Sequence, residues 1–289
     1  MSVTSSTLNL SDNGIEVASL LEQQLLSHHV DVPMLPDVAS RVLNLSNDPD
    51  SDAQQLANLI QSDQSLAGHV MRIANSAAYT PNASMVSLQQ AVARLGMDLI
   101  SEIAIAASLN SKLFKAPGYE KRMEMIWVHA LCSAFWAKEI ARAAKQNVEA
   151  SFLCSLLHSI GRPAVLQCIA DLAEKHEAVL SEEESRLLED HYHVEYGVEI
   201  VSKWEMPVIV QESVKYYLDY NAADNKAEQA MVVYAAAKAA ESTLWPEEFS
   251  VDQLKLNDVF ADLNLYEDEI EVLFDKEDVV KKGVEAIRI

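Results

Sequence analysis

Three of the eight histidines in this chain, His129, His158 and His193, are the residues whose types and order could do chemistry. Each lies in a segment with a helical pattern, and neutral imidazole is the commonest protein ligand for transition metals. Three imidazoles around one ion, with a fourth position open, would resemble a catalytic zinc site. A single helical His is more often a packed or surface residue. The metal interpretation therefore requires that the three side chains converge.

Other chemistries find less support. His191 and His193 are two residues apart on a predicted helix, so they do not share a face and cannot easily bind one ion. Ser155 and Ser159 lie near His158, but a serine next to its histidine on a helix is poorly placed for nucleophilic catalysis. The sequence has no glycine-rich phosphate loop of the P-loop or dinucleotide type.

The elements that must position these histidines are predicted to be helices throughout. Glycine (7) and proline (8) are scarce, apolar residues recur at helical spacing from Ile15 onward, and strand-like alternation does not persist. We expect an all-α fold with a flexible tail at 1–14, an N-terminal helical subdomain at 15–118, a second helical subdomain at 119–245 and an acidic helical extension at 246–289. The clearest break between the halves is Ala116-Pro117-Gly118.

Composition narrows the partners and the compartment. A net charge of −22 repels phosphate backbones, so we expect no nucleic-acid partner. No apolar run approaches the ~20 residues that cross a bilayer, and the N-terminus is not a secretory signal. Three cysteines without Cys-x-x-Cys spacing predict reduced, mostly buried thiols in a cytoplasmic protein.

Several motifs, in order, resemble the HDOD family of bacterial signalling proteins, a non-catalytic relative of the HD and HD-GYP phosphohydrolases. In the first half they are Val32-Pro33-Met34-Leu35-Pro36, the segment from Ile60 to Leu66, Asn75-Ser76-Ala77-Ala78-Tyr79 and the helix from Val86 to Leu95-Gly96. In the second half they are Trp127-Val128-His129, Leu157-His158-Ser159-Ile160-Gly161, His193-Val194-Glu195-Tyr196-Gly197 and Trp204-Glu205-Met206-Pro207. Tyr216-Tyr217 stands where many relatives have a His-His pair.

The resemblance implies a helical half packed on a degenerate HD-like half, with His129, His158, Ser159 and His193 at vestigial site positions. In the HD superfamily an Asp follows the histidine directly, where this chain has Ser159, and a distal Asp is replaced by Ala235 or Ala236. A neutral hydroxyl is a poor substitute for a carboxylate that bridges divalent ions, so magnesium and manganese should bind weakly.

We therefore expect a non-enzymatic regulatory module that acts in trans, has no catalytic residues, and needs no cofactor or metal. Its partner would be an unidentified signalling protein, or a small molecule held in the vestigial cavity. The alternative is a divergent phosphohydrolase that binds zinc, manganese, magnesium or iron through the three histidines and an unrecognised carboxylate, Glu189 or Glu195. Structural roles are expected for Asn75 and Tyr79 at a helix junction and for Trp127 and Trp204 as core anchors.

Overall fold

A computed structural model describes residues 8–46, 48–80, 85–109, 113–223 and 228–288, and within these ranges the chain forms helices and turns but no strand. This confirms the all-α prediction. The helices are α1 (Asp12–Leu26), α2 (Asp37–Ser46), α3 (Ala53–Gln61), α4 (Gln64–Ala74), α5 (Leu88–Leu95), α6 (Met97–Ser108), α7 (Glu120–Ala143), α8 (Val148–Leu157), α9 (Gly161–His176), α10 (Glu182–Lys203), α11 (Val208–Tyr216), α12 (Glu228–Leu244), α13 (Val251–Lys255), α14 (Asp258–Asp262), α15 (Glu267–Phe274) and α16 (Glu277–Arg288).

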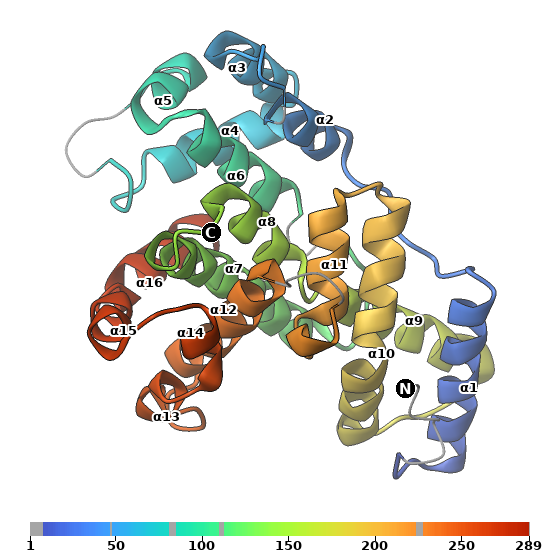
Figure 1. Cartoon of the computed structure of the whole chain (residues 1–289). Coiled ribbons are helices and arrows are strands. Elements are labelled where there is room, and N and C mark those ends of the chain that lie inside the picture. The colour runs from blue at the N-terminus through green and yellow to red at the C-terminus, as the bar shows by residue number, and fades with distance from the viewer. Residues whose placement is uncertain (1–7, 47, 81–84, 110–112, 224–227, 289) are drawn as a thin grey trace.

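Helices α2 to α6 form one lobe, at the top of Figure 1. Local signals set its helix ends. The Asp63 carboxylate accepts from the Leu66 amide at the start of α4, and Gly96, with a φ of 89°, ends α5. Asn75 fixes the junction after α4, because its side-chain amide bonds both backbone groups of Met85. The predicted structural role of Asn75 is thus confirmed.

Helices α7 to α12 form the second lobe around the 24-residue helix α7, which packs against α8 and α12. Trp136 on α7 is fully buried, and its indole N–H donates to the Thr243 hydroxyl on α12 at 2.9 Å. Trp127 and Trp204 are only partly buried, so they lie at the edge of the core and not within it as expected. Trp204 instead ties the second lobe to the segment between α1 and α2, since its indole N–H donates to the Pro33 carbonyl.

The first helix does not belong with the N-terminal lobe, which corrects the predicted subdomain at 15–118. Helix α1 packs on α9 and α10, well away from α2–α6 in Figure 1. Tyr192 and Tyr196 on α10 donate hydrogen bonds to the carbonyls of Ala18 and Leu21. The predicted tail at 1–14 is also too long. Residues 1–7 lie outside the described ranges, but α1 begins at Asp12, and the Ser11 amide donates to Glu184.

The acidic extension at 246–289 contains four short helices that cover α7 and α12. Gly283 on α16 sits so close to Phe135 of α7 that a β-carbon there would lie 2.7 Å from its ring. The extension is therefore part of the second lobe's core. All three cysteines are buried and free, as predicted.

One stretch of the described residues, Val148–His176, is long and apolar enough to cross a membrane by length and composition. It comprises α8, a tight turn and α9, and 83% of its most apolar window is buried inside the protein. Its hydropathy is that of a core element.

Candidate functional site

The three predicted histidines converge in the second lobe. The rings of His129 on α7 and His158 at the end of α8 have centroids 5.4 Å apart. Tyr217, just after α11, joins the third: its ring lies 5.0 Å from that of His158, and its hydroxyl is 2.8 Å from His193 Nε2 on α10. Four helices thus contribute to one cluster, which we call the histidine cluster (His129, His158, His193 and Tyr217).

A close approach of two helices makes this convergence possible. A β-carbon on Gly161 would lie 1.8 Å from the His193 carbonyl oxygen and 2.5 Å from the Gly197 amide nitrogen. Only glycine at 161 allows the start of α9 to touch the middle of α10. This contact brings His158, three residues earlier, next to His193. The Leu157-His158-Ser159-Ile160-Gly161 motif is therefore a packing device as well as a histidine site.

The imidazole nitrogens of the cluster are largely committed to protein groups. The Nδ1 atoms of His158 and His193 lie 2.6 Å and 3.0 Å from the carbonyls of Ser155 and Asp190, and His129 Nε2 lies 3.2 Å from that of Ala237. A carbonyl only accepts, so each of these nitrogens donates. Since neutral His193 donates through Nδ1, its Nε2 must accept from the Tyr217 hydroxyl. Neither nitrogen of His193 is left for a metal.

The charge beside the cluster also opposes a cation. Burial, with a contribution from the Arg162 guanidinium, lowers the pKa of His158 to about 4 and that of His193 to about 3. The pKa of His129 falls to about 3, chiefly through burial and the nearby His158, with a smaller contribution from Arg162. Arg162 thus adds a positive charge near the neutral imidazoles, which disfavours a divalent ion there, although its ion pairs with Glu189 and Asp190 offset much of that charge.

The candidate carboxylates do not supply the missing negative charge. Glu189 on α10 is 1% exposed, but it receives a bidentate pair of hydrogen bonds from Arg122 and a third from Arg162 at 2.7 Å. Glu195 is exposed on α10 and makes no ion pair within the described residues. The described part of the chain holds no group of three His, Cys, Asp or Glu side chains arranged to bind a metal ion.

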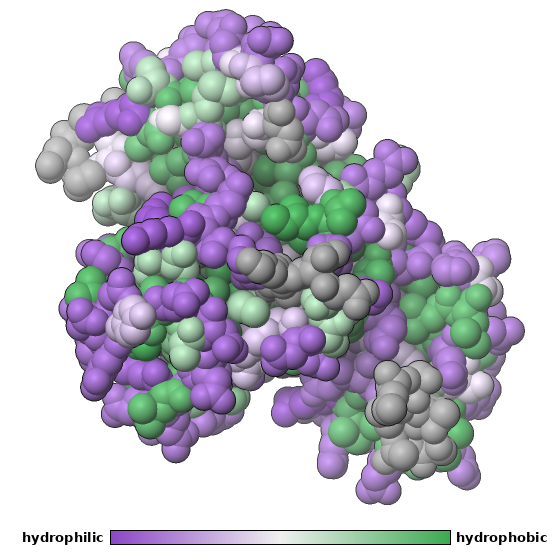
Figure 2. Space-filling model, viewed as in Figure 1, coloured by the Kyte–Doolittle hydropathy of each residue, from purple (hydrophilic) through white to green (hydrophobic). Residues whose placement is uncertain are grey.

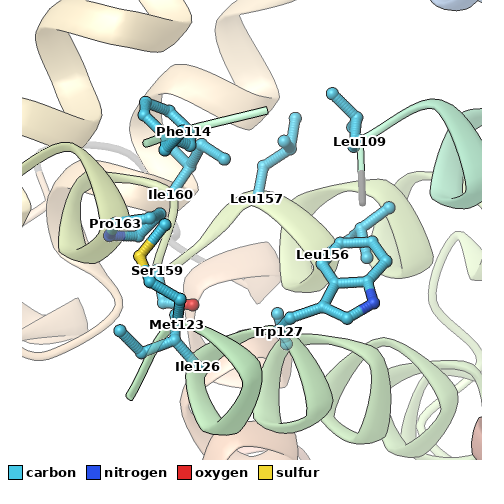
Figure 3. Close-up of a pocket in the computed structure, with 11 residues that line it drawn as sticks. Leu109, Phe114, Met123, Ile126, Trp127, Leu156, Leu157, Ser159, Ile160 and Pro163 are labelled. Atoms are coloured by element: carbon cyan, nitrogen blue, oxygen red, sulfur yellow. The ribbon is translucent and has the colours of Figure 1, made fainter. Parts of the chain in front are cut away.

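Ser159 faces a different place. Its side chain lines a small apolar pocket of about 30 Å³ between α7 and the α8–α9 turn, alongside Trp127, Leu157 and Phe114 (Figure 3). The hydroxyl is buried and has no hydrogen-bond partner among the described residues. Ala235 and Ala236, where the distal Asp was sought, are fully buried in α12. The donor set does not fit the metal centre that the HD superfamily implies.

A cleft of about 400 Å³ opens beside His129 and mixes charges of both signs. Arg122, Arg162 and Asp190 line it, and the Trp245 ring stacks on His129 at 5.9 Å. These two arginines, Arg122 and Arg162, were not identified from the sequence. Arg162 directly follows the quoted motif but was given no role, and its convergence with Arg122 on Glu189 joins residues up to 67 apart in the chain. Tyr217 was noted only because it stands where many relatives have a histidine, and the structure shows its hydroxyl bonded to His193.

The comparisons with known proteins assign the family. A model of the HDOD domain matches residues 32–220, which is well over half of the chain. The chain belongs to the HDOD family. The matched region contains α2 to α11 and with them His129, His158, His193 and Tyr217. The resemblance inferred from the motifs is confirmed.

Solved structures of the same fold are distant in sequence. An HDOD domain protein from Geobacter sulfurreducens is 23% identical with a TM-score of 0.73, covering 94% of this chain and 98% of that one. A Shewanella amazonensis protein, provisionally named a metal-dependent phosphohydrolase, is 21% identical with a TM-score of 0.68, covering 96% and 99%. A Treponema pallidum protein is 20% identical over 195 residues, and the match spans 37% of its length. These likenesses show the fold alone.

Proposed function

We propose that this HDOD protein is a non-enzymatic regulatory module of a bacterial cytoplasm, which acts by binding a partner protein or a small ligand in trans. One observation carries the proposal: among the described residues no carboxylate is available beside the histidine cluster, because Ser159 stands where the HD superfamily has its Asp and the buried Glu189 is bonded by Arg122 and Arg162. Neutral imidazoles with no free carboxylate beside them, and with both nitrogens of His193 already bonded, favour a structural centre over a metal centre.

Catalysis by an HD-type site needs a divalent ion to lower the pKa of a bound water and to polarise a phosphoryl oxygen. In this chain Ser159 stands in the place of the bridging Asp, and its hydroxyl lies in a separate apolar pocket. The buried Glu189 already serves two arginines. The loss of the Asp charge and the engagement of Glu189 by arginines both weaken the binding of a divalent ion.

The alternative, a divergent metal-dependent phosphohydrolase, has one specific observation in its favour. His129 and His158 have ring centroids 5.4 Å apart, close enough to share an ion if their side chains turned. Binding through His129 Nδ1 and His158 Nε2, which make no hydrogen bond among the described residues, would keep the bonds to Ala237 and Ser155 but would bring the ion near the Arg162 guanidinium. It would also leave the ion without an available carboxylate, unlike the oxygen-rich sites that magnesium and manganese prefer.

The decisive experiment measures bound metal by mass spectrometry in protein purified without a His tag and without chelator. We expect well below one transition-metal ion per chain, and no hydrolysis of a phosphodiester and phosphomonoester panel with manganese, zinc or magnesium added. A near-stoichiometric ion that disappears in His158→Ala but persists in His69→Ala would overturn the proposal. His69 is an exposed histidine on α4 and controls for surface binding.

A further inference from the structure

A groove begins at the junction of the two lobes and continues between helices of the second lobe, and no residue of the histidine cluster lines it. One part, of about 300 Å³, lies between α2, α6 and the starts of α8 and α11. A second part, of about 390 Å³, lies between α11 and the start of α12. Asn147 and Ile209 line both parts, so they form one continuous feature, which we call the interlobe groove.

The groove exposes large apolar side chains at its centre. Val208 and Ile209, both on the first turn of α11, are 68% and 41% exposed although their side chains are large and apolar. Figure 2 shows a green area where α11 begins, beside the cleft between the upper and lower lobes. Leu43, Ile105 and Leu153 from the two lobes continue the apolar lining. An apolar strip that water reaches and both lobes flank has the character of an interaction surface.

The rim of the groove is acidic. Asp98, Glu149, Glu212 and Glu228 line it and are exposed, and none of the four has an ion-pair partner within the described residues. Among the residues that the structure describes, neither part of the groove is lined by a lysine, arginine or histidine. A fifth carboxylate, Glu102, is neutralised from below by Lys138.

Helix dipoles offset only part of this charge. Asp98, Glu149 and Glu228 lie in the first turns of α6, α8 and α12, where each helix end carries roughly half a positive charge. Glu212 lies within α11 and has no such offset. The groove therefore keeps an excess of negative charge around an apolar floor.

We propose that the interlobe groove binds a basic amphipathic helix of a partner protein. Apolar residues at helical spacing on such a helix would cover Val208 and Ile209, while lysines or arginines beside them would meet the acidic rim. A second copy of this chain is a poor occupant, because each copy carries a net charge of −22. The inference rests on the proposed function, of which it names the partner class and the surface.

Occupancy of the groove would reach both lobes at once. Glu102 on α6 and Lys138 on α7 form an ion pair across the junction, and Glu102 also lines the groove. A helix seated there would contact α6 on one side and α11 on the other. The bound partner would thus fix the angle between the lobes, which is the kind of change that a regulatory module can transmit.

The test uses the full-length protein and a fluorescent synthetic peptide of about 14 residues, with leucines on one helical face and lysines on the other. Its affinity is measured by anisotropy and compared with that of a peptide of identical composition whose leucines are scattered around the helix. We expect the ordered peptide to bind about tenfold more tightly than the scrambled one, because both carry the same charge but only one presents an apolar face.

Paired variants localise the binding. Val208→Arg with Glu212→Lys should weaken the ordered peptide about tenfold. Val279→Arg with Glu285→Lys, on exposed positions of α16, makes the same change in net charge and should alter binding less than about twofold. Val208→Ser, which changes no charge, should weaken binding by a smaller factor. Thermal unfolding of each variant establishes that it is folded.

The proposal is overturned if the two double variants weaken the peptide equally, since binding would then reflect net charge alone. It is also overturned if the scrambled peptide binds as tightly as the ordered one, or if neither binds at low salt. These outcomes are independent of the metal and hydrolysis measurements. A metal-loaded, active protein would remove the proposed function whatever the peptide does.

Discussion

Replacing His158 by Gln should remove part of the acid sensitivity of folding. His158 is 1% exposed, and burial lowers its pKa from 6.5 to about 4. In the unfolded chain the imidazole takes up a proton below about pH 6.5, whereas in the folded protein it stays neutral to about pH 4. Its contribution to stability is therefore complete above pH 6.5 and is lost as the pH falls toward 4.

The magnitude follows from linkage. Between pH 7 and pH 5, preferential protonation of the unfolded state at this one histidine costs about 2 kcal/mol of unfolding free energy. Many carboxylates also begin to titrate in this range, so the informative quantity is a difference of differences. The loss of stability from pH 7 to pH 5 should be about 2 kcal/mol smaller in His158→Gln than in the wild type.

Urea unfolding followed by circular dichroism at the two pH values gives this quantity. Gln also loses the bond to the Ser155 carbonyl, which lowers stability at both pH values and cancels in the difference. His69→Gln is the matched control, because that imidazole is exposed to water in the folded protein as in the unfolded chain. Equal pH dependence in the wild type and in His158→Gln would refute the burial of a neutral imidazole.

Three further predictions concern packing and are checked by the same unfolding measurement. Glu189→Ala should lower the unfolding free energy by about 3–5 kcal/mol, because it leaves two arginines without their buried partner. Glu182→Ala is the control, since it removes an exposed ion pair and should lower the unfolding free energy by less than about 0.5 kcal/mol. Equal losses in the two variants would contradict the buried network. Gly161→Ala should prevent native packing of α9 on α10, while Gly68→Ala on α4, where a β-carbon meets nothing within 4 Å, should stabilise by about 0.5–1 kcal/mol. A soluble, fully stable Gly161→Ala protein would refute the close approach. Asn75→Ala should cost about 1–3 kcal/mol, since the Met85 amide loses its acceptor, and a smaller loss would mean that water replaces this bond.

Local features of the chain were predictable because they depend on neighbours in sequence. Asp63 and Gly96 mark helix ends through one side-chain or backbone conformation each, and both signals lie within a few residues of the end that they set. The motif around Asn75 likewise acts within ten residues, up to Met85. The docking of α1 was not predictable in this way. It depends on Tyr192 and Tyr196, more than 170 residues later, donating to its backbone.

The candidate site divides along the same line. Residue types and order picked out His129, His158 and His193, and the absence of an Asp at position 159 argued against a metal. Nothing in the sequence indicated that Arg162 would line the cleft beside His129 and pair with Glu189, or that Tyr217 would hold His193. Both facts require the turn after α8 and the end of α11 to meet α10. Such a meeting is set by helix packing and leaves no pattern in a short segment.

The sequence by itself determined the helical class, the family, the histidines and the missing carboxylate, because these follow from periodicity and from residue identity along the chain. The tertiary structure alone decided which groups surround the histidines and which surface is exposed. Gly161 lets two helices touch, and this contact brings the histidines together beside a permanent arginine charge. The interlobe groove likewise depends on packing, because one part lies where α2 and α6 meet α8 and α11, and the other lies between α11 and α12 within the second lobe.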